Sequence, residues 1–143
     1  MELEPQVEAF LASHRVGHLA TSDSRGVPHV IPVCYAYEAG TLYSALDLKP
    51  KRVRSRELKR VRNIRSNPRV ALIVDDYSED WDTLAYVLVQ GQAVILESGA
   101  ERQRAEALLR EKYDQYAELL EPGAPALRIT VERVVAWGRR FSA

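Results

Sequence analysis

Cysteine is nearly absent from this sequence, since Cys34 is the only one among 143 residues. A single cysteine excludes an internal disulfide framework and a cysteine-rich zinc site. Apolar runs are short as well, and none approaches the roughly 20 residues that a membrane-spanning helix needs. The acidic stretch MELEPQVEAF lacks the pattern of a signal peptide. We therefore expect a cytoplasmic protein that folds as one domain over residues 1–143 and has no membrane partner.

The motifs of the common enzyme classes are also missing. The chain has no glycine-rich dinucleotide-binding motif, no phosphate-binding P-loop and no nucleophile elbow. Its histidines, His14, His18 and His29, are not spaced as metal ligands. These absences argue against the usual catalytic sets, so we assign neither a catalytic residue nor a metal site.

Net charge is absent too, because 20 basic and 20 acidic side chains cancel. This balance hides a dense basic segment between Lys49 and Arg65, in which the only acid is Glu57. Such a density favours an anionic ligand, and the alternative is that the acidic stretch from Asp75 to Asp82 packs against it. The neutral chain and the lack of aromatic residues within the segment argue against nucleic acid as that ligand.

Hydrophobic periodicity predicts a mainly β, α+β fold. We expect six strands, over residues 16–21, 27–37, 41–46, 69–74, 85–96 and 127–137. Helices are expected over residues 5–13, in the basic segment up to Asn67, and over residues 99–120 with Ser98 as N-cap. Pro28 and Pro32 indicate an edge strand, a bulge or a ligand cleft, and Gly91 indicates a bulge or bend. Neighbouring strands joined by turns favour a small closed or split antiparallel barrel with peripheral helices.

The proline-bearing strand and the basic segment together suit one kind of ligand. An aromatic ring system can lie against strand backbone where prolines leave no unpaired donor, and a phosphate needs fixed cations. Lys49, Lys51, Lys59 and Arg60 supply such cations. A redox ring would bring its own chemistry, so the protein would need no acid–base triad. The pattern predicts a cofactor with a flat body and a phosphorylated tail.

An ordered set of segments resembles a known family. The segments are ATSDSRGVPHVIPV (20–33), TLYSALD (41–47), LKRVRNIRSNPRVALIVDDY (58–77) and VLVQGQAVI (87–95), with Trp81 before the last. Together they resemble the pyridoxamine 5′-phosphate oxidase-like superfamily of flavin-binding split β-barrels, over roughly residues 7–137. Within it, the pattern is most similar to the branch that uses the deazaflavin coenzyme F420.

The resemblance implies a six-stranded antiparallel split β-barrel that forms a homodimer, with two cofactor sites at the subunit interface. It implies strand backbone against the cofactor ring at His29, Val30, Ile31, Pro32 and Val33. It also implies a set of residues near the phosphate: Ser44, Ala45, Lys49, Lys51, Lys59, Arg60 and, in an assisting role, Asn63. Trp81 and Trp137 either wall the ring cleft from the partner subunit or serve only in packing.

Two functions of different classes follow. The first is an oxidoreductase that uses F420, with FMN as the close variant, and passes a hydride to a small organic substrate. Arg52, Arg54 and Arg56 would then meet the acidic tail that F420 carries and FMN lacks, or would simply be solvated. The second is a non-catalytic carrier of flavin or haem. Oxidation of pyridoxamine phosphate is not expected, because no histidine follows His29.

Overall fold

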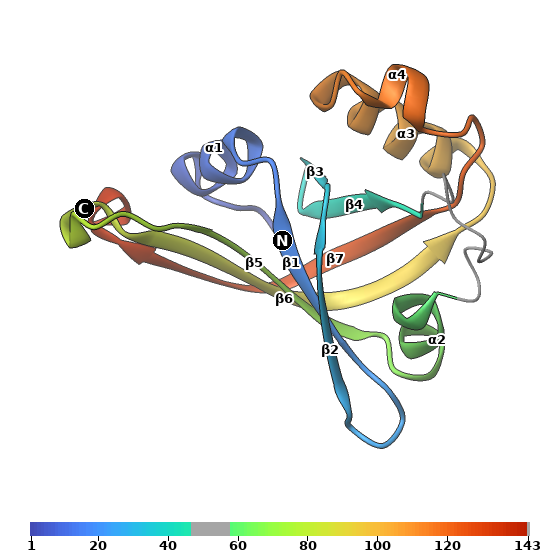
Figure 1. Cartoon of the computed structure of the whole chain (residues 1–143), viewed down its shortest axis with the longest axis horizontal. Helices are drawn as coiled ribbons and strands as arrows, with labels where there is room; N and C mark the ends of the chain where they lie inside the picture. The colour runs from blue at the N-terminus through green and yellow to red at the C-terminus, as the bar shows by residue number, and fades with distance from the viewer. Residues whose placement is uncertain (47–57, 143) are drawn as a thin grey trace.

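The computed structural model describes residues 1–46 and 58–142 (Figure 1). Its strands are β1 (Gly17–Ser22), β2 (Pro28–Val33), β3 (Ala36–Glu38), β4 (Thr41–Ala45), β5 (Arg69–Asp76), β6 (Ala85–Leu96) and β7 (Ala126–Gly138). Its helices are α1 (Pro5–Ser13), α2 (Lys59–Ser66), α3 (Ala100–Lys112) and α4 (Tyr116–Leu119), and 3₁₀ turns are found at η2 (Trp81–Thr83) and η3 (Arg139–Phe141). The mainly β, α+β class expected from the periodicity is confirmed.

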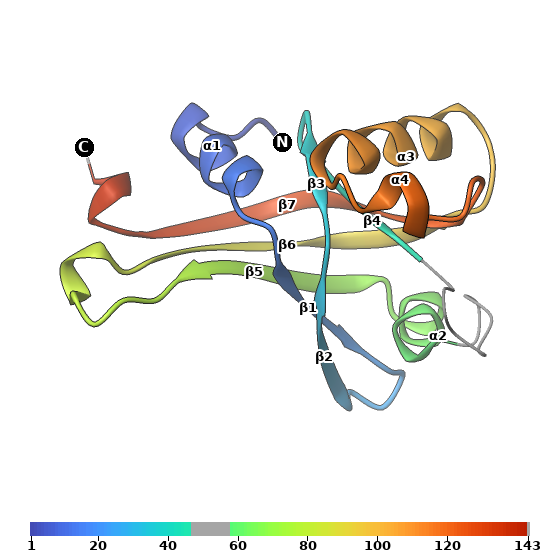
Figure 2. The ribbon, with the colours of Figure 1, turned by 45° about the horizontal axis from the view of Figure 1, so that its top comes forward.

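The described strands form one antiparallel sheet in the order β2-β1-β5-β6-β7-β4-β3. The prediction of six strands is wrong, because the segment expected as one strand over residues 27–37 divides into β2 and β3. β2 pairs with β1, whereas β3 pairs with β4, so two consecutive strands lie at opposite edges. Figure 2 shows them as one run that crosses the long strands β5, β6 and β7. The sheet is therefore curled and open, and the closed barrel is excluded for the described strands.

The division of that segment has a cause at Tyr35, whose side chain is fully buried. The hydroxyl of Tyr113 accepts a hydrogen bond from the backbone N–H of Tyr35 at 3.0 Å and lies 3.1 Å from its carbonyl oxygen. The hydroxyl of Tyr35 donates to the carbonyl oxygen of Leu11 at 2.6 Å. Backbone groups satisfied by a side chain are not available to a neighbouring strand, so the ladder breaks here and the chain changes edges.

The helix expected over residues 99–120 is also divided, into α3 and α4. Tyr113 stands at the break with extended backbone (φ −118°, ψ 104°), and its hydroxyl is held at the junction of β2 and β3. The expected N-cap is wrong as well, because Gly99 takes that position and makes no side-chain capping bond. Tertiary hydrogen bonds thus override a helical pattern that is continuous in the sequence.

The bulge expected at Gly91 is confirmed. The register between β6 and β7 shifts between Gln90 and Gly91, since Gln90 faces Arg133 and Gly91 faces Val131. A Cβ atom on Gly91 would lie 2.0 Å from the carbonyl oxygen of Thr130, so only glycine permits this close approach.

The helices lie on different sides of the long strands. In Figures 1 and 2, α1, α3 and α4 lie on one side of β5, β6 and β7, and α2 lies on the other, near β2. Helix α1 packs Val7, Phe10 and Leu11 into the main core. None of the helices within the described ranges is long and apolar enough to cross a membrane.

Candidate functional site

Helix α2 (Lys59–Ser66) lies in the part of the basic segment that the structure describes. It begins after Leu58 and ends at Asn67, because the residue before a proline avoids helical backbone. Val61 and Ile64 are buried and anchor the helix in the main core. This anchoring fixes the rotation of α2 and thereby decides which of its polar side chains are buried and which face water.

Asn63 lies on the buried face of α2 and is only 1% exposed. Its side-chain Nδ2 donates a hydrogen bond to Thr21 Oγ1 at 3.0 Å. Thr21 of β1 is the register partner of His29 of β2, so the two side chains project from the same face of the sheet. Asn63 Oδ1 and His29 Nδ1 are both buried, and neither has a hydrogen-bond partner among the described residues. Asn63 and His29, two of the predicted site residues, therefore both lie next to Thr21. Each has a buried polar atom without a partner among the described residues.

Arg60, in the first turn of α2, is partly buried. Its Nε atom is buried and has no hydrogen-bond partner in the part of the chain that is described. Burial lowers the pKa of Arg60 below its ordinary value, and the nearby phenol of Tyr116 acts in the opposite direction. A buried guanidinium nitrogen without an acceptor is costly, and an anion would relieve that cost.

Lys59, the first residue of α2, has an exposed side chain. Its side chain is 40% exposed, and Nζ lies 3.9 Å from Asp23 Oδ2. Asp23 organises the turn between β1 and β2 by accepting hydrogen bonds from the backbone N–H groups of Val27 and Arg25. Those bonds, more than Lys59, lower the pKa of the Asp23 carboxyl. The long contact leaves Lys59 able to hold a second anion.

Strand β2 forms one edge of the sheet, as the two prolines predict. His29, Ile31 and Val33 point to the more buried side, whereas Pro28, Val30 and Pro32 are exposed. Val30 is 61% exposed. The strand thus carries His29 on the face where Thr21 and Asn63 meet, and the exposed Pro28, Val30 and Pro32 on the opposite face.

The remaining predicted residues lie elsewhere. Ser44 is 2% exposed and donates its hydroxyl hydrogen to the carbonyl oxygen of Cys34 at 2.7 Å, and Ala45 is buried beside it on β4. Lys49 and Lys51 lie outside the described residues, as do Arg52, Arg54 and Arg56. The structure therefore brings together the β2 and α2 members of the predicted site.

The acidic stretch from Asp75 to Asp82 makes its ion pairs with the C-terminal arginines. Asp76 lies 3.0 Å from Arg140 and 2.6 Å from His14, and Asp82 lies 3.2 Å from Arg139. These contacts form at the end of the long strands away from α2 (Figures 1 and 2). Among the described residues, the ion pairs of Lys59 and Arg65 are with Asp23 and Glu97 and not with this acidic stretch.

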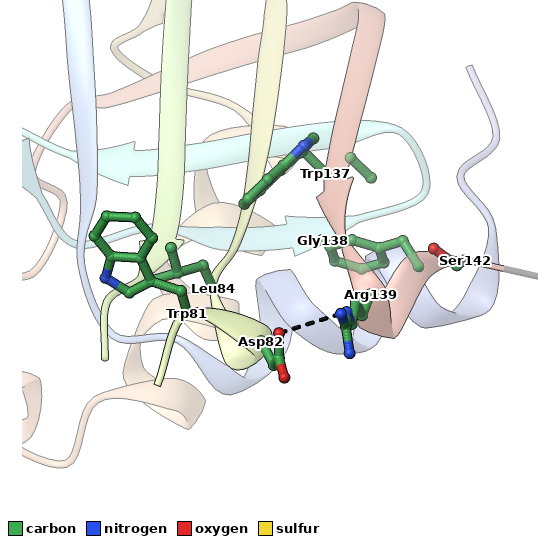
Figure 3. A pocket seen from close by; sticks show the side chains of 9 residues that line it. Trp81, Asp82, Leu84, Trp137, Gly138, Arg139 and Ser142 are labelled. Atoms are coloured by element: carbon green, nitrogen blue, oxygen red, sulfur yellow. Dashed lines mark ion pairs between the residues drawn. The ribbon is translucent and has the colours of Figure 1, made fainter. Parts of the chain in front are cut away.

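A second region of interest holds both tryptophans. Trp81 of η2 and Trp137 of β7 line one open pocket of about 510 Å³. Figure 3 shows both indoles beside Leu84 and Gly138, with the ion pair of Asp82 and Arg139 at the rim. The sequence analysis singled out both tryptophans. It could not predict that they line the same pocket, because 55 residues separate them in the chain.

Known proteins resemble this chain over nearly its whole length. A family profile described as pyridoxamine 5′-phosphate oxidase matches residues 3–138. A 5a,11a-dehydrotetracycline/5a,11a-dehydrooxytetracycline reductase from Streptomyces rimosus is 31% identical over 133 residues, covering 90% of this chain and 78% of the reductase.

Solved structures share the fold. A conserved hypothetical protein from Mycobacterium tuberculosis is 25% identical with a TM-score of 0.77, and the match covers 98% of this chain and 87% of that one. An FAD-binding protein from Mesorhizobium loti is 26% identical with a TM-score of 0.68, and the match covers 94% of each chain.

Proposed function

The chain belongs to the pyridoxamine 5′-phosphate oxidase family, and on this premise we propose that it is an oxidoreductase. It binds F420, or FMN as the close variant, and passes a hydride to a small organic substrate. The reductase from Streptomyces rimosus supports the reaction class. The dense cations between Lys49 and Arg65 favour F420 over FMN, because its tail carries more negative charge.

One observation carries this proposal: among the described residues, three of the four buried side-chain polar atoms without partners belong to residues expected at the cofactor, and the fourth is Arg128 Nε. His29 Nδ1, Arg60 Nε and Asn63 Oδ1 are all buried and unpaired within the described residues. An unsatisfied buried polar group costs about 1–3 kcal/mol. A ligand that supplies acceptors to Arg60 and hydrogen-bonding groups near His29 and Asn63 would remove part of that cost. The residues present therefore fit a group with a polar, anionic end.

Each residue has a role that follows from its position. Lys59 and Arg60 hold the anionic end, Lys59 as an exposed cation and Arg60 as a desolvated donor. The stretch from His29 to Val33 presents edge-strand backbone and apolar side chains to a flat ring. Bound F420 or FMN supplies the hydride chemistry itself. The chain positions the reactants and excludes water, and it needs no catalytic acid or base of its own.

We also propose that two copies associate through the outer face of the sheet. A row of register partners runs across five strands on this face: Pro32, His18, Ile73, Leu88 and Val135. All except His18 are apolar, and each is partly or fully exposed. An apolar row of this length is unusual on an isolated monomer and suits a self-complementary interface. The exposed Val30 of the same face lies on β2, so the interface would adjoin the cofactor site.

The absorbance spectrum tests cofactor binding. Apoprotein is titrated with F420 and, separately, with FMN, and we expect saturable binding that is tighter for F420. The double variant Lys59→Ala/Arg60→Ala should lose two charge-assisted bonds of about 1.5–3 kcal/mol each, a fall in affinity of at least about a hundredfold. Arg104→Ala is the matched control, because its side chain is 53% exposed on α3 and lies outside the basic segment. Unchanged affinity in the double variant would contradict the phosphate assignment.

The rate of reoxidation, measured by stopped flow, distinguishes an oxidoreductase from a non-catalytic carrier of flavin or haem. An oxidoreductase, once reduced and loaded, is reoxidised by an organic acceptor with a rate that saturates in acceptor concentration. A carrier of flavin or haem shows no such saturation with any acceptor. A titration with haem, followed by its Soret absorbance, tests the carrier directly.

A further inference from the structure

Lys112, the last residue of α3, is partly buried among aromatic rings. Its Nζ atom lies 3.8 Å from the ring centroid of Tyr35 and 5.3 Å from that of Tyr113. The same atom donates a hydrogen bond to the carbonyl oxygen of Leu11 at 3.3 Å. No carboxylate of the described residues forms an ion pair with it. Lys112 therefore lacks the anionic partner that usually accompanies a buried ammonium group.

The surroundings of this amine favour its neutral form. Burial is the main cause that lowers the pKa of Lys112 to about 8, and Arg15 acts in the same direction, whereas Cys34 opposes both. A neutral amine has a lone pair that can attack carbon, and it still has a hydrogen to donate to Leu11. Lys112 is therefore a better nucleophile than a lysine surrounded by water.

The amine borders an open pocket of about 420 Å³, a volume within the range of small-molecule sites. The pocket lies where the ends of α1 and α3 meet β3, and its wall includes Ala12, Arg15, Tyr37, Leu108 and Glu111 beside Lys112. A small molecule can therefore reach the amine from solvent along a partly apolar wall.

Arg15 is held at the wall of this pocket. Its Nη2 atom donates to the carbonyl oxygen of Lys112 at 2.7 Å, and its guanidinium carbon lies 4.7 Å from the ring centroid of Tyr113. A guanidinium has five N–H donors, so others remain for a carboxylate or phosphate group of a ligand. The exposed carboxylate of Glu111 also lines the pocket. Recognition of an anion there depends on the position of Arg15 and not on net charge.

The pocket lies away from the outer-face row and from the candidate cofactor site. Helix α1 packs on the face of β5 that carries Leu72 and Val74, whereas Ile73 of the outer-face row points to the opposite face. Both α1 and α3 lie on one side of the long strands, and α2 lies on the other (Figures 1 and 2). Neither a second copy nor a cofactor is needed to form the pocket.

We propose that Lys112 binds a small aromatic aldehyde covalently, as an imine, and that Arg15 binds an anionic group of the same molecule. Tyr37 and Leu108 offer the ring an aromatic and an aliphatic contact. The nitrogen lone pair attacks the carbonyl carbon, the carbonyl π bond breaks, and both amine hydrogens leave with the oxygen as one water molecule. An aldehyde suits this site because the condensation needs an uncharged amine and no oxidant, reductant or cofactor.

Reductive trapping tests the proposal on the full chain without any cofactor. The protein is incubated with 4-carboxybenzaldehyde at about pH 8, and sodium cyanoborohydride converts the imine into a stable secondary amine. Peptide mass spectrometry then compares Lys112 with Lys59, whose side chain is 40% exposed on α2. We expect Lys112 to be modified at least about tenfold faster. Equal or slower modification of Lys112 would overturn the proposal.

The same labelling in urea shows whether the folded pocket is responsible. Unfolding exposes both amines to water and removes the rings around Lys112, so its preference over Lys59 should disappear. A preference that persists in urea would be a property of the local sequence and would contradict the role of the pocket.

Arg15→Gln tests the anionic part of the ligand. The quantity measured is the rate of Lys112 labelling by 4-carboxybenzaldehyde divided by the rate with benzaldehyde, because this ratio cancels the effect of Arg15 on the amine. We expect the ratio to fall at least about threefold in Arg15→Gln. It should not change in Arg104→Gln, since Arg104 is 53% exposed on α3 and does not line the pocket. An unchanged ratio in Arg15→Gln would contradict the assignment of Arg15.

Discussion

The amide of Asn63 and the hydroxyl of Thr21 form a buried hydrogen bond of 3.0 Å between residues 42 positions apart in the chain. The bond joins α2 to β1 and fixes the helix against the sheet. It satisfies Nδ2 of Asn63 but leaves Oδ1 without a partner among the described residues. One side chain thus stabilises the fold through one atom, while its other polar atom is buried without a described partner.

A double-mutant cycle measures the structural part of that role. Thr21→Val removes the acceptor and leaves Nδ2 buried and unpaired, so the free energy of unfolding should fall by about 1–3 kcal/mol. Thr21→Val/Asn63→Leu removes both partners and should recover part of the loss. Urea denaturation of the four proteins checks this. Additive losses would show that the two residues are not coupled.

Arg60→Met should stabilise the apoprotein and weaken the cofactor complex. The substitution removes a buried, unpaired guanidinium nitrogen and keeps most of the side-chain volume, so the free energy of unfolding should rise by about 1 kcal/mol. Affinity for F420 should fall at least tenfold. Urea denaturation and absorbance titration measure the two quantities. A less stable variant with unchanged affinity would make Arg60 a purely structural residue.

Leu88→Asp should convert the proposed homodimer into a monomer. Leu88 lies next to Ile73, the central member of the outer-face row, so each dimer would bury two unpaired carboxylates. Light scattering coupled to size-exclusion chromatography measures the mass. Leu119→Asp, on α4, should leave the mass unchanged. A monomeric wild-type protein would contradict this interface.

Gly91→Ala should destabilise the fold by at least about 3 kcal/mol, because the new Cβ atom would collide with the Thr130 carbonyl oxygen. Gln92→Ala, at the exposed next position, should change the free energy of unfolding by less than about 0.5 kcal/mol. Thermal unfolding of both variants, followed by circular dichroism, makes the comparison. Similar melting temperatures would mean that the bulge can move.

Lys112 should make stability rise with pH. Burial, with a smaller effect of Arg15, lowers the pKa of Lys112 from 10.5 to about 8. Between these values the unfolded chain holds more protons than the folded one, so the free energy of unfolding increases as pH rises through 8.

Lys112→Met should lose this increase. Urea denaturation between about pH 7 and about pH 9.5 measures the difference, a range that stays below the raised pKa values of Tyr35 and Tyr113. Parallel pH profiles for the two proteins would contradict the assignment.

Local patterns in the sequence predicted the exact bounds of two elements. The helix Pro5–Ser13 and the strand Ala85–Leu96 follow from periodicity and flanking residues, and both have the bounds expected. Of the alternatives left open by Pro28 and Pro32, the structure shows an edge strand, and of those left open by Gly91 it shows a bulge. These features depend on neighbours in the chain, so the sequence contains them directly. The family, too, was evident from ordered segments.

Other features depend on contacts between distant residues. The break at Tyr35 and the end of α3 both arise because one hydroxyl, that of Tyr113, binds backbone 78 residues away. The burial of Arg60 follows from the way Val61 and Ile64 anchor α2, and the pocket exists because β6 and β7 bring Trp81 beside Trp137.

The sequence by itself determined which residues carry charge, where proline restricts the backbone, and where apolar and polar residues alternate along a strand. The tertiary structure decided which polar atoms remain unpaired. That outcome depends on the sum of all contacts around an atom, and no local pattern contains that sum.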